Sequence, residues 1–249
     1  MAEPGPRLRV GALYPDLLNI YADRGNLMVI TRRCEWRGIE VAVDSIGLGE
    51  PLDPGRYDLL YLGGGQDADQ RLCGEELSGA KGAALRGASD GGTVILAVCG
   101  GYQLLGRSYQ LGDEMVPGAQ VLDIETVRGD GPRLVGNVAI EVELAGMAGP
   151  RRLAGFENHG GRTALDQGQE PLGRVISGHG NDGSSGFEGA VTGNTVGTYL
   201  HGPLLPANVW FADWLIGRAL GVDSLDALDD GLEEQAHLSA LAAAGQASG

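Results

Sequence analysis

Short apolar runs alternate along the chain with longer segments of helical spacing. The apolar runs cover residues 8–13, 39–43, 57–62 and 94–98. Residues 26–37 and, more loosely, residues 67–88 repeat apolar positions at helical intervals. Runs that are apolar at every position are typical of parallel strands buried on both faces, and helices alternate with such strands. The pattern therefore predicts an α/β fold, with a mostly parallel central sheet and helices on both faces.

The second half of the chain consists of shorter β-like segments. They cover residues 138–144, 186–191 and 195–200, and we expect them to form an antiparallel extension of the sheet. A last helix is predicted over residues 206–220. From Gly221 onward the chain is rich in Asp, Glu, Ala, Gly and Ser, which favours a weakly packed tail with some helical character. We expect one folded domain over residues 1–222 and an acidic, Ala-rich tail over residues 223–249.

The net charge and the cysteine content of the chain disfavour several classes of protein function. The 249 residues include 33 acidic and 18 basic side chains, a net charge of -15, which disfavours nucleic acid and anionic membranes as direct partners. No apolar run approaches the roughly 18 residues of a membrane span, so we expect a cytoplasmic protein that acts on a small molecule or a protein. The three cysteines form no C-x-x-C pair, which argues against a disulfide framework and a zinc site.

One of these cysteines lies where a buried strand ends. Cys99 directly follows residues 94–98, and Gly100 and Gly101 permit a sharp turn into a helix. This arrangement is typical of a nucleophile elbow, with sulfur as the nucleophile. The helix N-terminus favours the thiolate, and the Gly100 amide is placed to face an oxyanion. The alternative is a small buried cysteine that only packs the strand end.

A thiol that attacks an acyl group needs a base and a second oxyanion donor. Three glycines at residues 63–65 follow the third apolar run and let a backbone N–H approach a substrate, although an ordinary turn would look the same. His201 follows residues 195–200 and is the favoured base. His159 is the alternative, since a base and a polar pocket lining look alike in sequence. His179 and His237 lie in polar segments, where we expect exposure.

Several motifs together resemble the class I glutamine amidotransferases, in the branch shared by the cobyric acid and cobyrinate synthases. They are LLNIYADRGN, GGGQD, VCGGYQLLG, RLVGN, GFENHGGRT and GTYLHGPLLP, and they span about residues 8–219. The last two favour the group that serves peptidoglycan synthesis over the corrinoid group. The resemblance implies that residues 1–222 are a glutamine amidotransferase catalytic domain.

The resemblance also implies roles for individual residues. Cys99 would attack the side-chain amide of L-glutamine and form a thioester, with His201 as general base and acid. The backbone at Gly65 and Gly100 would form the oxyanion hole.

Two polar side chains are candidates for substrate binding. The resemblance implies that Arg133 holds the substrate, and an arginine fork fits the α-carboxylate of glutamine by two parallel hydrogen bonds. Outside its motif, Arg133 would be interpreted as a surface arginine. Gln103 lies one helical turn past the thiol and is either a substrate contact or a helix stabiliser.

The chain departs from one feature of the family. Many class I amidotransferases read H-x-E after the last strand, where the glutamate orients the imidazole, but residue 203 is a proline. Loss of an orienting carboxylate costs about four orders of magnitude in rate in a serine protease triad. We therefore expect either a partner chain to supply an acidic residue to His201, or an internal carboxylate such as Glu157 or Asp16 to do so.

The chain also lacks a phosphate-binding loop. Lys81 is the only lysine and has no strand-then-loop context, so we expect no cofactor on this chain and ATP and Mg²⁺ on a partner. The resemblance implies a heterodimer with a Mur-ligase-like subunit. That subunit would activate the D-glutamate α-carboxylate of lipid II, and ammonia would convert it to D-isoglutamine. Contact with the inner face of the membrane would then fall to the partner.

Three further interpretations compete with this one. The first is a glutaminase of a corrinoid amidation pathway, and the second is a Cys–His peptidase built on the same elbow. The third is a non-catalytic binding or scaffolding protein that keeps the elbow for packing.

Overall fold

The central sheet has six strands in the order β13-β14-β4-β3-β1-β2. The computed structural model describes residues 5–20 and 24–245, so part of the LLNIYADRGN motif and both chain ends lie outside the described residues. The strands are β1 (Arg7–Leu13), β2 (Glu40–Ile46), β3 (Leu59–Leu62), β4 (Val94–Val98), β13 (Ala190–Thr192) and β14 (Thr195–Thr198). All neighbours in this sheet pair in parallel except β13, which runs antiparallel to β14.

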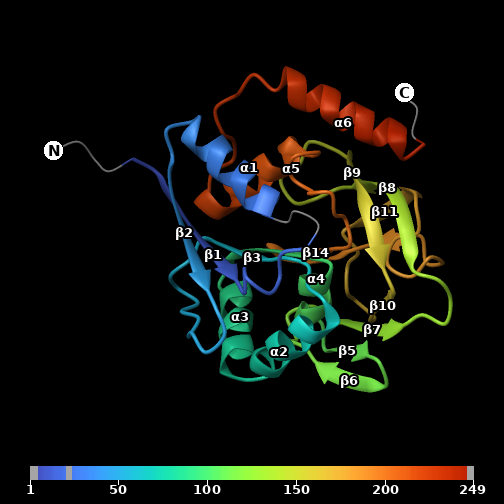
Figure 1. Ribbon diagram of the computed structural model, residues 1–249. Helices are drawn as coiled ribbons and strands as arrows, with labels where there is room; N and C mark the ends of the chain where they lie inside the picture. The colour runs from blue at the N-terminus through green and yellow to red at the C-terminus, as the bar shows by residue number, and fades with distance from the viewer. Residues whose placement is uncertain (1–4, 21–23, 246–249) are drawn as a thin grey trace.

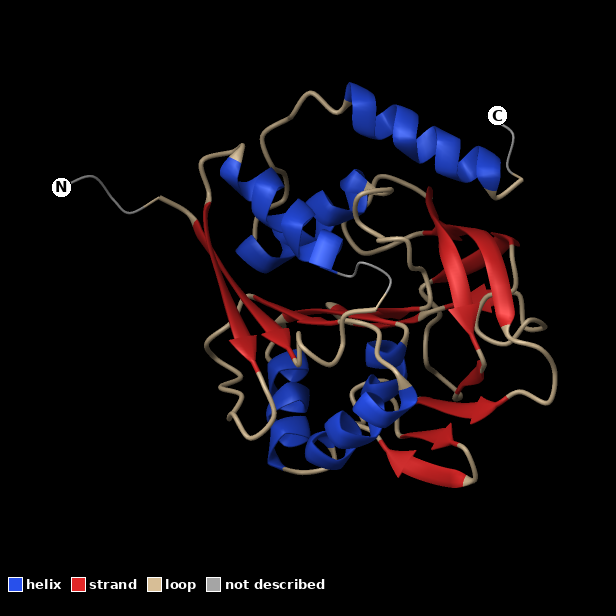
Figure 2. Ribbon diagram, in the orientation of Figure 1, coloured by secondary structure: helices blue, strands red, loops and turns tan. Residues whose placement is uncertain are grey.

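Helices cover both faces of this sheet (Figures 1 and 2). On one face lie α1 (Arg24–Glu35) and α5 (Val209–Leu220), and on the other lie α2 (Asp67–Leu77), α3 (Ala80–Asp90) and α4 (Gly100–Leu105). Strands β3 and β4 are buried at every position, as expected for strands covered on both sides. The predicted α/β fold with helices on both faces is confirmed. The loose helical segment over residues 67–88 is two helices, because the chain leaves helical geometry at Gly79.

The antiparallel part of the molecule consists of two separate four-stranded sheets at one end of the central sheet (Figure 2). One has the order β10-β7-β5-β6 and the other β12-β11-β8-β9. Their strands are β5 (Ser108–Leu111), β6 (Glu114–Pro117), β7 (Ile124–Arg128), β8 (Leu134–Val142), β9 (Arg151–His159), β10 (Gly161–Leu165), β11 (Gly173–Ser177) and β12 (Phe187–Glu188). All pairs in them are antiparallel apart from β5 with β7.

Two of the predicted antiparallel segments need correction. Residues 195–200 were expected in the extension, but β14 pairs in parallel with β4 and therefore belongs to the central sheet. Residues 186–191 are divided between β12 and β13 at Gly189, whose φ of +65° breaks the strand. Apolar runs of this length do not reveal which neighbour a strand will pair with, so the sequence pattern alone leaves the assignment open.

The segment after Gly221 ends in a helix that lies along β8 and β9 (Figure 1). This helix, α6 (Gly231–Ala243), has mostly exposed side chains. Leu241 and Ala244 pack on Ala139 and Ala154 in a small apolar cluster separate from the main core. The predicted helical character of the tail is therefore confined to α6, whose apolar contact with the domain is small. The division of the chain near residue 222 stays a prediction.

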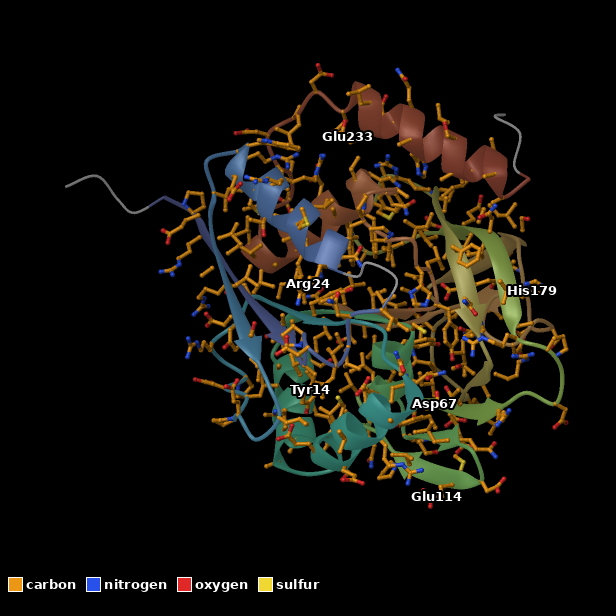
Figure 3. All side chains as sticks on the ribbon, in the orientation of Figure 1. Tyr14, Arg24, Asp67, Glu114, His179 and Glu233 are labelled. Atoms are coloured by element: carbon orange, nitrogen blue, oxygen red, sulfur yellow. The ribbon has the colours of Figure 1, made fainter. Side chains whose placement is uncertain are left out.

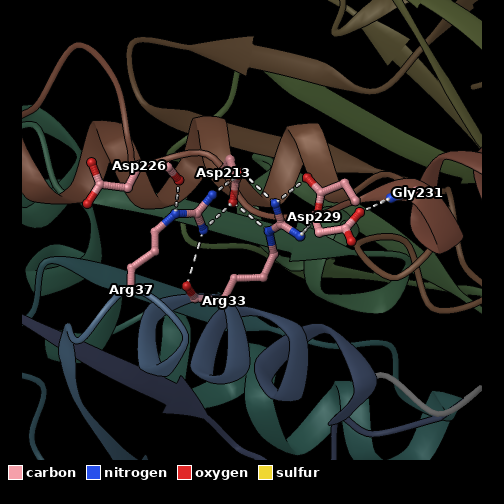
Figure 4. A network of polar contacts seen from close by, with 7 residues as sticks. Arg33, Arg37, Asp213, Asp226, Asp229 and Gly231 are labelled. Atoms are coloured by element: carbon pink, nitrogen blue, oxygen red, sulfur yellow. Dashed lines mark hydrogen bonds and ion pairs between the residues drawn. The ribbon is translucent and has the colours of Figure 1, made fainter.

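A network of charged side chains attaches the start of this segment to the domain (Figure 4). Arg33 of α1 is 1% exposed and donates two hydrogen bonds of 2.6 Å to Asp213 of α5 and bonds of 2.7 and 2.8 Å to Asp230. Arg37 also donates to Asp213, at 2.7 and 3.0 Å, and to the carbonyl oxygen of Asp226 at 2.6 Å. The hydrogen bonds from Arg33 lower the pKa of Asp230. Two arginines thus join α1, α5 and the C-terminal segment.

Replacing Arg33 by alanine should destabilise the fold strongly. The change removes the partner of Asp230 and one of the two arginines that bind Asp213. Breaking a buried ion pair from one side costs about 3–5 kcal/mol, and we expect the lower end because both carboxylates are partly exposed. Arg32→Ala on the same helix is the matched control, because Arg32 pairs with Glu35 on the surface and such pairs contribute about 0–1 kcal/mol. Urea unfolding of both variants measures the difference. Equal losses would show that the buried network does not stabilise the domain.

Candidate active site

Cys99 occupies a strained turn between β4 and α4. Its φ of 51° and ψ of -108° are rare for a residue with a side chain, and such conformations cost about 1–3 kcal/mol. Its N–H donates to the Thr198 carbonyl at 2.8 Å, so the turn is attached to the neighbouring strand. A side chain at Gly101 would come within 2.7 Å of the Leu62 carbonyl oxygen, so only glycine fits there. The local geometry is that of a nucleophile elbow, and the thiol is 7% exposed.

Two backbone amides lie close together beside this turn. A Cβ added to Gly100 would lie 2.9 Å from the nitrogen of Gly65 and 2.0 Å from Nε2 of Gln70, which shows how closely the two glycines approach. Among the described residues, neither the Gly65 nor the Gly100 N–H has a hydrogen-bond acceptor. Paired backbone donors next to a nucleophile suit a developing oxyanion.

A cavity of about 260 Å³ opens at this edge of the sheet. Four of the predicted site residues line it, namely Cys99, Gly65, Gln103 and Arg133. Gly100 and His201 do not line it. The structure therefore brings residues from three separated segments to one hollow: Gly65, the turn and helix that hold Cys99 and Gln103, and Arg133.

His201 leaves the sheet at the same edge as Cys99, because β14 lies next to β4. Its backbone exchanges two hydrogen bonds with Phe156 of β9, of 2.9 and 3.1 Å, and its side chain is 1% exposed. The turn that follows packs on α1. A Cβ at Gly25 would lie 2.6 Å from the ring of Pro203, and the side chain of Asn26 accepts the N–H of Leu205 at 2.8 Å. The imidazole thus belongs to a segment fixed on two sides.

His159, the alternative base, lines the cavity and is 2% exposed. Its ring stacks on Tyr199 with centroids 3.6 Å apart and planes 4° from parallel. Its Nδ1 lies 2.9 Å from the carbonyl oxygen of Gly161. Burial lowers the pKa of His159 to about 4, and the nearby Arg162, His201 and Arg133 act in the same direction. His159 is therefore a neutral imidazole at physiological pH.

Gln103 is held in a defined orientation by two other polar side chains. Its Oε1 accepts from Gln70 at 3.1 Å, and its Nε2 donates to the hydroxyl of Tyr199 at 3.1 Å. The Tyr199 hydroxyl lies 2.6 Å from that of Thr163, and burial raises the pKa of Tyr199 to about 12. Gln103 therefore fixes part of the cavity wall, so both sequence interpretations of this residue remain compatible with its position.

Charged side chains stand around the cavity mouth. Arg133 is exposed and uses Nε and Nη2 to donate to the side chain and carbonyl of Asn158, at 2.9 and 2.6 Å. Arg128 also lines the cavity, as does Asp67 in the first turn of α2, which Figure 3 labels. Both signs of charge are thus available to a zwitterionic ligand.

The two internal carboxylates considered for the triad have other surroundings. Glu157 is fully buried and accepts from the backbone N–H and Nδ1 of His179, each at 2.7 Å, and from the N–H of Gly180 at 2.9 Å. Asp16 is exposed in a separate hollow beside α1. The source of an orienting carboxylate for His201 stays a prediction.

The remaining candidates can be placed as well. The side chain of His179 is 46% exposed, as expected, whereas His237 is half-buried with Nδ1 2.8 Å from the Ala207 carbonyl oxygen, so its predicted exposure was wrong. Lys81 is buried in an ion pair with Glu76. Within the described residues there is no group of three or more His, Cys, Asp or Glu side chains that could hold a metal ion. No helix in the described ranges is long and apolar enough to cross a membrane.

Some cavity residues carried no sequence signal strong enough to select them. Gln70 lies one turn after the GGGQD motif, and Arg128 ends a strand that the pattern did not predict. Tyr199 does not line the cavity but accepts a hydrogen bond from Gln103, which does. Each is an ordinary polar residue in its own segment. A signal exists only for Gln70, which lies close to the GGGQD motif, and for Tyr199, which lies within the GTYLHGPLLP motif.

Comparisons with known proteins agree with this geometry. Residues 9–209 match the family described as the CobB/CobQ-like glutamine amidotransferase domain. The chain is 40% identical to the lipid II isoglutaminyl synthase (glutamine-hydrolyzing) subunit GatD of Staphylococcus aureus, over 82% of this chain and 81% of that relative. Identity to the GatD subunit of Streptococcus pneumoniae is 35%, over 86% and 81%. Identity to the cobyric acid synthase of Pelotomaculum thermopropionicum is 36%, over 62% of this chain and 31% of the relative.

Solved structures share the fold at lower identity. A chain of PurLQS from Thermotoga maritima superposes with a TM-score of 0.57 at 18% identity, covering 96% of this chain and all of that one. A glutamine amidotransferase from the same organism gives a TM-score of 0.50 at 22% identity, covering 78% and 75%. The match over residues 9–209, together with the elbow and its cavity, shows that the chain belongs to the CobB/CobQ-like glutamine amidotransferase family.

Proposed function

We propose that this chain is the glutaminase subunit of a lipid II isoglutaminyl synthase. The observation that carries the proposal is Cys99, held in a strained elbow and lining a cavity together with Gly65, Gln103 and Arg133. Membership of the amidotransferase family supports the reaction class. Identities of 35% and 40% to two GatD subunits, each covered over 81% of its length, support the biological role.

The reaction proceeds through a thioester. The Cys99 thiolate attacks the carboxamide carbon of L-glutamine, and the resulting oxyanion accepts hydrogen bonds from the N–H groups of Gly65 and Gly100. His201 takes the proton of the Cys99 thiol as the thiolate forms and then donates it to the departing nitrogen, which leaves as ammonia. His201 then takes a proton from water, which attacks the thioester and releases glutamate.

The charged groups at the cavity mouth suit a free amino acid. The Arg133 guanidinium offers its fork to the α-carboxylate, and the carboxylate of Asp67 is available to the α-ammonium group. Gln103, fixed by Gln70 and Tyr199, lines the same cavity as the thiol and contacts the side chain of the substrate.

The ammonia is consumed by a partner subunit. Free ammonia at neutral pH is mostly protonated and is then not a nucleophile, so release into solution would waste the product. We propose a Mur-ligase-like partner of the MurT type, which binds ATP and Mg²⁺ and activates the D-glutamate α-carboxylate of lipid II. Ammonia then converts that carboxylate to D-isoglutamine. The names of the GatD relatives, each a subunit of a glutamine-hydrolysing synthase, support such an assembly.

A corrinoid pathway is the second candidate. It is favoured by the match to cobyric acid synthase, but that match covers 31% of the relative, against 81% for each GatD subunit. Co-purification with the candidate ligase, followed by assays with lipid II and with a corrinoid acid, tests the two. We expect lipid II to gain D-isoglutamine and glutamine hydrolysis to be faster in the complex than in the isolated chain. Amidation of the corrinoid acid alone would contradict the proposal, and equal hydrolysis rates would remove the expected activation by the partner.

Cys99→Ala should abolish glutamine hydrolysis, because no other group replaces the nucleophile. Binding of the ligase should be retained, since the thiol is confined to the cavity. Cys73→Ala is the control, because Cys73 is a buried thiol of α2 that does not line the cavity. The rate of ammonia release measures glutamine hydrolysis by both variants. Hydrolysis that survives in Cys99→Ala would mean that the nucleophile is another residue.

Arg133→Ala should weaken glutamine binding more than it slows the chemical step. Hydrogen bonds to charged groups contribute about 1.5–3 kcal/mol, so we expect KM to rise roughly tenfold to a hundredfold. Arg133→Lys keeps the charge without the fork and should give a smaller rise. Steady-state kinetics of the complex checks both variants. A KM that does not change would make Arg133 a surface residue with no substrate contact.

A further inference from the structure

His159 presents an imidazole nitrogen that the described fold does not use. The side chain is 2% exposed and lines the same cavity as Cys99. Its Nε2 is buried and has no hydrogen-bond partner among the described residues. A buried polar atom left without a partner costs about 1–3 kcal/mol, so such an atom on a side chain that lines a cavity indicates a ligand contact.

The surroundings fix which kind of contact Nε2 can make. The carbonyl oxygen of Gly161 can only accept, so the Nδ1 that lies 2.9 Å away carries the hydrogen. The imidazole is neutral at physiological pH because burial lowers its pKa to about 4. A neutral ring with its hydrogen on Nδ1 has a lone pair on Nε2. Nε2 is therefore a hydrogen-bond acceptor.

The ring that carries this acceptor is held rigidly. It stacks on Tyr199, whose hydroxyl is fixed by Thr163 and Gln103. The backbone of Gly161 is equally confined, since a Cβ there would lie 2.6 Å from Thr126 and 2.7 Å from Nε2 of Gln103. Because Tyr199 and Gly161 hold the ring of His159 in place, its Nε2 needs little reorganisation when a ligand binds.

Glutamine and glutamate differ in what they offer to such an acceptor. The carboxamide of glutamine has two N–H donors, whereas the side-chain carboxylate of glutamate has none and would place its own lone pairs against Nε2. Sites built to hydrogen-bond a particular group reject analogues that lack it, because the buried partner is then unpaired.

We propose that His159 is a specificity-determining residue, whose Nε2 accepts a hydrogen bond from the carboxamide NH₂ of bound glutamine. The inference rests on the proposed function of the cavity. It gives His159 a role distinct from that of a base: the residue selects the amide substrate and disfavours the acid product. Repulsion between the Nε2 lone pair and the side-chain carboxylate of glutamate also favours release of the product after hydrolysis.

His159→Phe tests the proposal in the complex with the ligase. The phenyl ring keeps the stacking surface for Tyr199 but removes both ring nitrogens. We expect KM for L-glutamine to rise roughly tenfold to a hundredfold, the equivalent of losing a buried hydrogen bond. The inhibition constant of L-glutamate should stay unchanged or fall. His159→Gln restores an acceptor oxygen and should recover part of the affinity for glutamine.

A covalent probe separates recognition of the amide from damage to the cavity. A diazoketone analogue of glutamine alkylates the thiol and has no carboxamide N–H, so its rate of reaction with Cys99 should be the same in His159→Phe and in the unmodified complex. His237→Phe is the matched control, because His237 lies on α6 outside the cavity. Its kinetics should not change.

Each of the following outcomes would contradict the inference about His159. Parallel losses for glutamine, glutamate and the diazoketone would overturn the inference and make His159 a residue that only shapes the cavity. A fall in kcat with KM unchanged would overturn it in favour of proton transfer by His159. If the unmodified complex neither hydrolyses glutamine nor reacts with the diazoketone, the proposed function fails and the inference fails with it.

Discussion

The parallel pairing of β14 with β4 is the constraint on which the rest of the site depends. The register sets Thr198 beside Val98, and the N–H of Cys99 continues the ladder to the Thr198 carbonyl. Both strands therefore end at the same edge, so the thiol and the segment of His201 emerge together although 102 residues separate them in sequence. A buried parallel pair of this kind cannot slip by one residue without turning every side chain to the opposite face.

Several residues around this pair of strands have locally unfavourable conformations or contacts. Cys99 has a conformation that few side chains tolerate, Gly100 and Gly101 leave no space for a Cβ, and His159 keeps a buried nitrogen without a protein partner in the described part of the chain. Strain and unsatisfied polar groups that gather in one cavity are typical of functional sites. Strand β3 lies next to β4, and both are buried at every position, so close packing supplies the rigidity that keeps these features in place.

The sequence was informative where a local pattern decides the structure. The four apolar runs before residue 100, the helix at α1 and the turn at Cys99 could all be predicted, because runs of apolar residues, helical spacing and paired glycines are local features of the sequence. The pairing of β14 with β4 could not be predicted, since the sequence of a short apolar strand does not indicate which strand it will pair with. The strands of the antiparallel sheets between residues 108 and 177 were largely missed, because their half-exposed faces include many polar residues. The hydrogen bonds that link Gln70, Gln103 and Tyr199 join distant segments, so only the assembled fold reveals them.

Helix α1 has a different neighbour at each end. Its first turn supports the loop of His201 through Gly25 and Asn26, and its last turns carry Arg33, which binds Asp230 just before α6. Twelve residues of helix form a rod about 18 Å long. Truncation of the acidic C-terminus at Gly221 would therefore not be neutral. It would remove Asp230, one of the two carboxylates that bind Arg33 near the C-terminal end of α1, and the N-terminal end of the same helix supports the loop of His201.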